Sequence, residues 1–84
     1  MIHKIYAIFD SKAEAYSLPF YYQHEGQALR TVIDWLNDPN TPYAKHPEDY
    51  TLFDLGTYDE NTGTITQDAI KSIQNLVQLQ EKIQ

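Results

Sequence analysis

The sequence contains no cysteine, which excludes disulfide bonds and thiolate metal sites. Positive charge is scarce, since six Lys and Arg stand against twelve Asp and Glu and give a formal net charge of −6. An acidic protein repels phosphate at long range, so this balance disfavours nucleic-acid binding by a broad basic surface. No long apolar run is present, and we expect neither a signal peptide nor a membrane span, but an intracellular protein.

The usual signatures of catalysis are also missing. The three histidines are far apart and lack the paired spacing of metal ligands, and the three glycines are isolated, so no phosphate-binding loop is formed. No serine lies in a strained elbow, and the carboxylate pairs lie in polar loops where we expect solvated charges. We therefore expect no enzyme, no catalytic residue, no metal and no cofactor.

What the sequence does contain is a high share of aromatic residues in a short chain. With 84 residues we expect a single domain over residues 1–84, and self-association into a homo-oligomer is one way for so small a chain to bury more surface. Seven tyrosines, three phenylalanines and one tryptophan suit a small core, but they also suit interfaces and base stacking.

Hydrophobic patterning predicts an α+β fold. β-branched and aromatic runs indicate strands, and the segment with Pro19 is expected at a sheet edge because proline cannot donate to a ladder. Apolar residues at helical spacing indicate two helices, the second capped by Asp68. The predicted elements are strands at 2–9, 16–23, 50–58 and 64–66, helices at 25–37 and 69–83, and a long loop at 38–49.

The order strand-strand-helix-strand-strand-helix predicts a two-layer sandwich, a mainly antiparallel sheet of about four strands with two helices on one face. In the third strand, Phe53 and Leu55 are expected to point inward, and Gly56 is expected to mark a bulge or a close backbone approach. The exposed sheet face is expected to carry Lys4, Tyr6, Tyr50 and Tyr58.

Two kinds of interaction follow from these residues. Aromatic side chains beside a few cations predict single-stranded DNA binding, in which rings stack on bases and cations contact phosphates. The second helix is apolar over more of its surface than one contact with a sheet needs, which predicts an oligomer interface. The candidate DNA-binding residues are Lys4, Tyr6, Lys12, Tyr21, Tyr22, Arg30, Tyr43, Lys45 and His46, and the candidate oligomer-interface residues are Ile73, Leu76, Leu79 and Ile83.

Several short motifs resemble a known family. They are residues 10–13 (DSKA), 37–39 (NDP) and above all 45–53 (KHPEDYTLF), supported by residues 19–20, 28–30, 56 and 62–63, so that the match spans roughly residues 5–65. In these motifs the chain resembles the small nonstructural, DNA-binding-type protein of the gokushoviruses, which are single-stranded DNA bacteriophages of the Microviridae.

This resemblance implies a non-enzymatic phage protein in the host bacterial cytoplasm, absent from the mature virion. It also implies a role in viral genome replication or in its switch to packaging. The alternative is an adaptor that binds a phage replication, capsid or host protein without contacting DNA, as the acidic balance favours. The 45–53 segment also has a structural alternative, a loop brace with Tyr50 in the core and Glu48 near Lys45.

Overall fold

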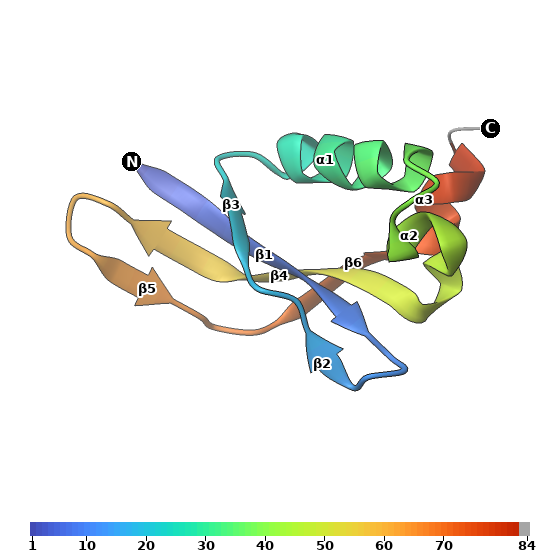
Figure 1. The fold of residues 1–84 in the computed structure, drawn as a ribbon. Helices are drawn as coiled ribbons and strands as arrows, with labels where there is room; N and C mark the ends of the chain where they lie inside the picture. The colour runs from blue at the N-terminus through green and yellow to red at the C-terminus, as the bar shows by residue number, and fades with distance from the viewer. Residues whose placement is uncertain (83–84) are drawn as a thin grey trace.

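In the computed structural model, which describes residues 1–82, six strands form one antiparallel sheet and three α-helices lie on one side of it (Figure 1). The α+β class and the antiparallel sheet are confirmed, whereas four strands and two helices match the layout only roughly. The elements are β1 (Ile2–Asp10), β2 (Ala15–Tyr16), β3 (Phe20–Tyr22), α1 (Glu25–Asn37), α2 (Pro42–Lys45), the 3-10 helix η1 (Pro47–Asp49), β4 (Tyr50–Asp59), β5 (Thr64–Thr66), β6 (Lys71–Asn75) and α3 (Leu76–Lys82).

The centre of the sheet is a pair of long strands, β1 and β4, which run antiparallel over nearly their whole lengths. The short strands β2 and β3 both pair with the outer edge of β1, and β5 and β6 both pair with β4. The expected edge strand at 16–23 is therefore at an edge, but it is divided in two around Pro19. The division agrees with the missing N–H of proline, which interrupts a ladder.

A β-bulge in β4 changes which residues share a face. Ile5 pairs with Gly56 and Tyr6 pairs with Asp54, so Leu55 is the extra residue. Gly56 has a φ of 140°, and a Cβ there would lie 2.1 Å from the carbonyl oxygen of Thr66. Both expectations for Gly56, a bulge and a close backbone approach, are confirmed. Because the bulge shifts the alternation by one, Phe53 and Tyr58 lie on the same face of the sheet.

Helix α1 has the predicted bounds and covers one face of the sheet. The Gln27 side chain accepts a hydrogen bond from the backbone N–H of His24 at the helix start. The buried side chains of α1 pack on buried side chains of β1 and β4, in a core formed by Tyr6, Ile8, Ala28, Val32, Leu36, Leu52, Leu76 and Leu79.

The prediction of the exposed sheet face was wrong for most of its residues. Tyr6 is fully buried under the helices, and Tyr50 packs against the same core. Leu52, rather than Phe53 or Leu55, is the fully buried residue of β4. The physical reason is that both faces of β1 are apolar, so alternation alone does not show which face the helices cover.

The predicted loop at 38–49 also contains regular structure. Thr41 caps α2 by accepting a hydrogen bond from the Ala44 N–H at 3.2 Å, and Pro42 follows as the first helical residue. Proline is favoured there because its fixed φ suits a helix start, and the same holds for Pro47 at the start of η1. Two of the three prolines in the predicted loop, Pro42 and Pro47, therefore start short helices.

The predicted helix at 69–83 is the largest error in secondary structure. Residues Lys71–Asn75 form β6, which pairs with β4, and only Leu76–Lys82 form a helix. Asn75, rather than Asp68, caps this helix, because the side-chain oxygen of Asn75 accepts a hydrogen bond from the Val77 N–H at 2.9 Å. Backbone pairing with a distant strand has overridden the local helical pattern.

Candidate binding site on the open sheet face

No described helix lies over the sheet face opposite the three helices (Figure 1). The strand registers place apolar and aromatic side chains on this face. The register of the six strands places these side chains together, because directly opposed residues in a ladder point to the same face. We call this surface the open face. Its side chains are those of His3, Ile5, Ala7, Phe9, Tyr16, Tyr21, Phe53, Tyr58 and Ile65, of which Ile5 and Ala7 are buried among their neighbours on the sheet.

One end of the open face is a cluster of three aromatic rings. Phe9 lies 4.8 Å from Tyr16 between ring centroids, and Tyr16 lies 5.5 Å from Phe53 in an edge-to-face arrangement. The Tyr16 side chain is 45% exposed, so its ring is available to a partner. Rings held by neighbouring rings lose little freedom on binding, which favours their use in recognition.

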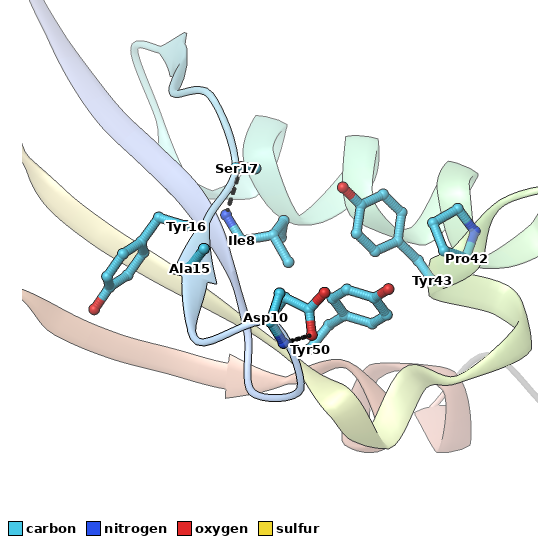
Figure 2. Close-up of a pocket in the computed structure, with 9 residues that line it drawn as sticks. Ile8, Asp10, Ala15, Tyr16, Ser17, Pro42, Tyr43 and Tyr50 are labelled. Atoms are coloured by element: carbon cyan, nitrogen blue, oxygen red, sulfur yellow. Dashed lines mark hydrogen bonds between the residues drawn. The ribbon is translucent and has the colours of Figure 1, made fainter.

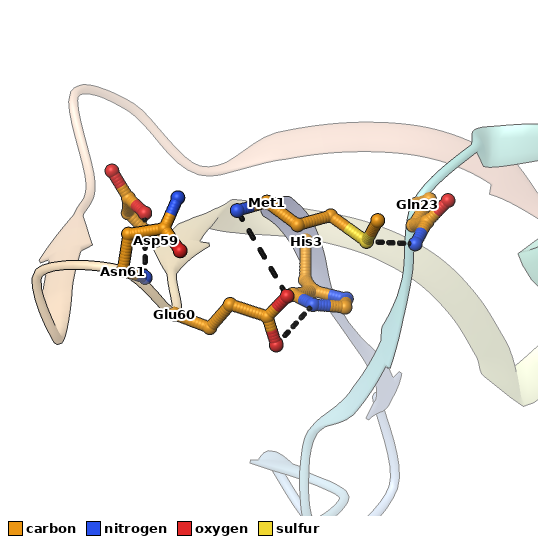
Figure 3. A network of polar contacts seen from close by, with 6 residues as sticks. All are labelled: Met1, His3, Gln23, Asp59, Glu60 and Asn61. Atoms are coloured by element: carbon orange, nitrogen blue, oxygen red, sulfur yellow. Dashed lines mark hydrogen bonds and ion pairs between the residues drawn. The ribbon is translucent and has the colours of Figure 1, made fainter.

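The other end of the open face is a pocket of about 380 Å³, lined by His3, Tyr21, Tyr58 and Ile65. Tyr21 and Ile65 are 51% and 67% exposed, so the walls of the pocket are accessible. His3 is held in place by Glu60, whose carboxylate lies 3.3 Å from Nε2 (Figure 3). The amino group of Met1 lies 3.9 Å from the same carboxylate. The pocket therefore offers flat apolar surfaces and one orientated imidazole.

The structure separates the four tyrosines that the sequence analysis proposed for base stacking. Only Tyr21 lies on the open face. Tyr6 is fully buried, and Tyr22 lies on the helix face, where its hydroxyl pairs with the Thr31 hydroxyl at 2.7 Å. Tyr43 stacks on Trp35 at 5.3 Å, also on the helix side. The buried ring of Tyr6 therefore cannot contact a base.

The predicted cations do not gather beside the open face. Lys4 lies on the opposite face, 3.8 Å from the Asp54 carboxylate, and Lys12 lies in the turn after β1. Arg30 is an exposed residue of α1, and Lys45 and His46 lie at the end of α2. Within residues 1–82, the strand positions of the open face include no Lys or Arg.

The predicted oligomer interface is not a free surface. Leu76 and Leu79 are 0% and 3% exposed in the core of the chain itself, and Ile73 lies in β6 and packs against that core. Ile83 lies outside the described residues. The broad apolar pattern that suggested an interface is explained by a strand and a helix that bury different faces in one core.

Sequence reasoning placed Tyr58 on the exposed sheet face, but it missed three aromatic members of the open face: Phe9, Tyr16 and Phe53. A signal was present, since Ile5, Ala7 and Phe9 alternate along one strand. The same alternation was visible for Tyr6 and Ile8, and only the position of α1 shows which set is covered.

A second pocket, of about 290 Å³, lies on the helix side near the turn between β1 and β2 (Figure 2). Asp10, Tyr43 and Tyr50 are among its lining residues. Burial raises the pKa of the Tyr50 hydroxyl, and the Asp10 carboxylate adds to the shift; the pKa of Tyr43 is raised by the same two causes.

This pocket is the place where two of the distinctive sequence motifs meet. The backbone N–H of Ser11 donates to the Asp49 carbonyl at 2.9 Å, and the Ser11 hydroxyl donates to the same oxygen at 3.1 Å. The 10–13 and 45–53 segments are thereby tied together. Tyr50 packs against the core as the loop-brace alternative expected, while Glu48 lies 3.9 Å from His46.

His46, Glu48 and Asp49 place one possible metal-ligand atom each within 4.8 Å of one another. His46 and Glu48 are exposed, and Asp49 is partly buried. Exposed acidic groups of this kind are ordinarily solvated, so we assign no ion to the cluster.

Fold and surface define the class of this protein: a small α+β protein with one antiparallel sheet, helices on one face and aromatic side chains on the other. None of the helices described in residues 1–82 has the length and apolar character needed to cross a membrane. A family model described as Phage ORF5 protein matches residues 3–79, and the chain therefore belongs to this bacteriophage protein family. No curated protein and no solved structure matches the chain.

Proposed function

We propose that this phage protein is a non-enzymatic, single-stranded DNA-binding protein that stacks bases on its open face. The observation that carries the proposal is an uncovered sheet face with two half-exposed tyrosines, Tyr16 and Tyr21, at its two ends. An open antiparallel sheet whose aromatic side chains stack on unpaired bases is a common solution for binding single strands. Each stacked base contributes about 1–3 kcal/mol, so binding of this kind needs few cations.

The biological role that we propose is in viral genome replication or its switch to packaging, in the cytoplasm of the bacterial host. Support comes from membership of a bacteriophage family and from the resemblance of the sequence motifs to gokushovirus proteins. The net charge of −6 and the lack of Lys or Arg on the open face (within the described residues) favour stacking over phosphate contacts. DNA binding should therefore weaken only slightly as salt is raised.

Fluorescence anisotropy of a labelled oligothymidine, titrated with the protein at low and near-physiological salt, tests this proposal. We expect saturable binding whose logarithmic salt slope corresponds to no more than about two phosphates. Tyr21→Ala and Tyr16→Ala should each lower the affinity by about fivefold to a hundredfold, the range expected for one lost stacking contact.

Leu18→Ala is the matched control, because Leu18 is 89% exposed and lies between β2 and β3 rather than on a sheet strand. It removes an exposed apolar side chain and should leave the affinity unchanged. A flat titration at both salt concentrations, or an equal loss for Leu18→Ala and Tyr21→Ala, would contradict the proposal.

A second candidate is the adaptor that binds a phage replication, capsid or host protein through the same face. The specific observation in its favour is the apolar lining of the pocket at His3, Tyr21, Tyr58 and Ile65. Recovery of a phage protein by the wild-type chain, lost in Tyr21→Ala and accompanied by a flat DNA titration, would favour the adaptor. Saturable DNA binding that is weakened in Tyr21→Ala, without any recovered phage protein, would exclude it.

A further inference from the structure

The pocket on the helix side combines one carboxylate with aromatic walls. Figure 2 shows Asp10 beside the ring of Tyr50, with Tyr43 and Pro42 on the α2 side of the same pocket. Tyr16 also lines the pocket, although its ring lies on the open face and points away from Asp10 and Tyr43 (Figure 2). The pocket therefore adjoins the open face at Tyr16, but Asp10, Tyr43 and Tyr50 are not part of the surface proposed to bind DNA, and variants at these residues test the pocket independently.

The Asp10 carboxylate is held in a fixed position. Its Oδ1 accepts hydrogen bonds from the backbone N–H groups of Lys12 at 2.9 Å and Ala13 at 3.2 Å, as in an Asx turn. The second oxygen, Oδ2, has no hydrogen-bond or ion-pair partner within residues 1–82. A carboxylate that is orientated by one oxygen leaves the other free to accept from a bound group.

The two tyrosine rings are also fixed. Tyr43 and Tyr50 lie 4.9 Å apart between centroids, at an interplanar angle of 74°, and Trp35 stacks behind Tyr43. Two aromatic faces near one carboxylate attract a cation through the ring quadrupoles and the negative charge together. They repel an anion for the same reason, and Asp49, whose charge also acts on Tyr50, adds to this repulsion.

We infer that this pocket binds an arginine side chain of a protein partner. A guanidinium group is planar, so it can stack on a tyrosine ring and still donate hydrogen bonds to the free oxygen of Asp10. The volume of about 290 Å³ accommodates such a side chain, and the net charge of −6 favours a basic partner. Lys12 and Lys45 do not line the pocket.

NMR titration of the full chain with acetyl-arginine methylamide tests the inference directly. Acetyl-citrulline methylamide is the control ligand, because it has almost the same shape but no charge. We expect saturable shifts of the amide signals of Asp10, Ser11, Ala13, Tyr43 and Tyr50 with the arginine compound. The citrulline compound should bind about tenfold more weakly, as expected for the loss of one charge-assisted hydrogen bond and a cation–π contact.

Asp10→Asn separates the charge from the fold, since the asparagine oxygen can still accept from the N–H groups of Lys12 and Ala13. It should weaken arginine binding by about tenfold. Glu14→Gln is the matched variant, because it removes one negative charge from an exposed residue of the same turn that does not line the pocket. It should bind the arginine compound like the wild type.

Equal affinity for the arginine and citrulline compounds would overturn the inference, and this comparison needs only the wild-type chain. Equal losses in Asp10→Asn and Glu14→Gln would also overturn it, because they would indicate a general effect of charge. Oligothymidine binding by Asp10→Asn is expected to stay at the wild-type level, so a failure here and a failure of the DNA-binding proposal can be distinguished.

Discussion

Replacing Gly56 by alanine should lower the stability of this protein more than any other single-methyl addition at a glycine. Gly56 has a φ of 140°, a region that residues with a Cβ enter only under strain, at a cost of about 1–3 kcal/mol. The new methyl group would also lie 2.1 Å from the Thr66 carbonyl oxygen and 3.3 Å from the Cα of Gln67. Both atoms belong to backbone, so β5 must move away from the bulge.

Forced repacking of this kind costs about another 1–3 kcal/mol. The expected loss in the free energy of unfolding is therefore about 2–6 kcal/mol, a large fraction of the roughly 4–13 kcal/mol typical of a chain of this size. Urea unfolding followed by the fluorescence of Trp35, the single tryptophan, measures this loss. The Gln67 side chain, which donates to the Leu55 carbonyl at 2.9 Å, should lose this bond when β5 moves.

Substitutions at the other two glycines separate the cost of backbone strain from the cost of the close contact. Gly63 has a φ of 72° and open space around its Cβ position, so Gly63→Ala should cost only about 1 kcal/mol of backbone strain. Gly26 has open space and lies inside α1, so Gly26→Ala should stabilise the protein by about 0.4–1 kcal/mol. If Gly56→Ala unfolds within 0.5 kcal/mol of wild type (about the size of an ordinary surface change), the close approach of β5 to the bulge is refuted.

Three further predictions concern the hydroxyl of Tyr6 and the side chain of Asn75. The hydroxyl of Tyr6 is buried without a hydrogen-bond partner within residues 1–82, so Tyr6→Phe should raise the free energy of unfolding by about 1 kcal/mol, measured in urea at pH 7. Burial, with Asp54 and Glu25 adding to it, raises the pKa of Tyr6 to about 12, above the value of about 10 expected in the unfolded chain. The folded state therefore keeps the Tyr6 proton up to a higher pH than the unfolded chain does. The stability that depends on this proton is complete below pH 10, and the free energy of unfolding falls by roughly 2 kcal/mol as the pH rises from 10 towards 12. Tyr6→Phe lacks this hydroxyl and should show a smaller alkaline loss in the same assay. Asn75→Ala should lower the free energy of unfolding by about 1–2 kcal/mol, because it removes the cap of α3 and the hydrogen bonds to the Glu48 carbonyl and the Thr51 hydroxyl. Gln78→Ala is the control, since Gln78 is an exposed residue of the same helix. A thermal midpoint of Asn75→Ala equal to that of Gln78→Ala would contradict this role.

Local sequence information was sufficient where a structural element depends on its own residues. Helix α1 begins and ends at the predicted residues, because its apolar face repeats at helical spacing and Pro39 disfavours helical angles at Asp38. Strand β5 has its predicted bounds, and the segment with Pro19 lies at the sheet edge. Gly56 was identified because glycine inside a strand pattern indicates a bulge or a close contact.

Local information failed where long-range pairing decides the structure. Residues 71–75 have apolar positions compatible with a helix, but β4 offers unpaired backbone groups there, and pairing turns the segment into β6. The helix pattern therefore held only from Leu76 onward. The two short helices in the 38–49 segment were missed because their prolines were interpreted as loop signals rather than as first residues of helices.

The sequence by itself determined the α+β class and the antiparallel strands. It also showed directly that the chain is acidic, rich in aromatic residues and free of cysteine. Only the tertiary structure decided which face of the sheet is covered. Both faces of β1 are apolar, so burying Tyr6 and Ile8 under α1 leaves the side with Phe9 open, and the bulge at Leu55 then brings Tyr58 to that side as well. Candidate surfaces depend on this choice, because a one-residue change in alternation moves a side chain from the core to the solvent.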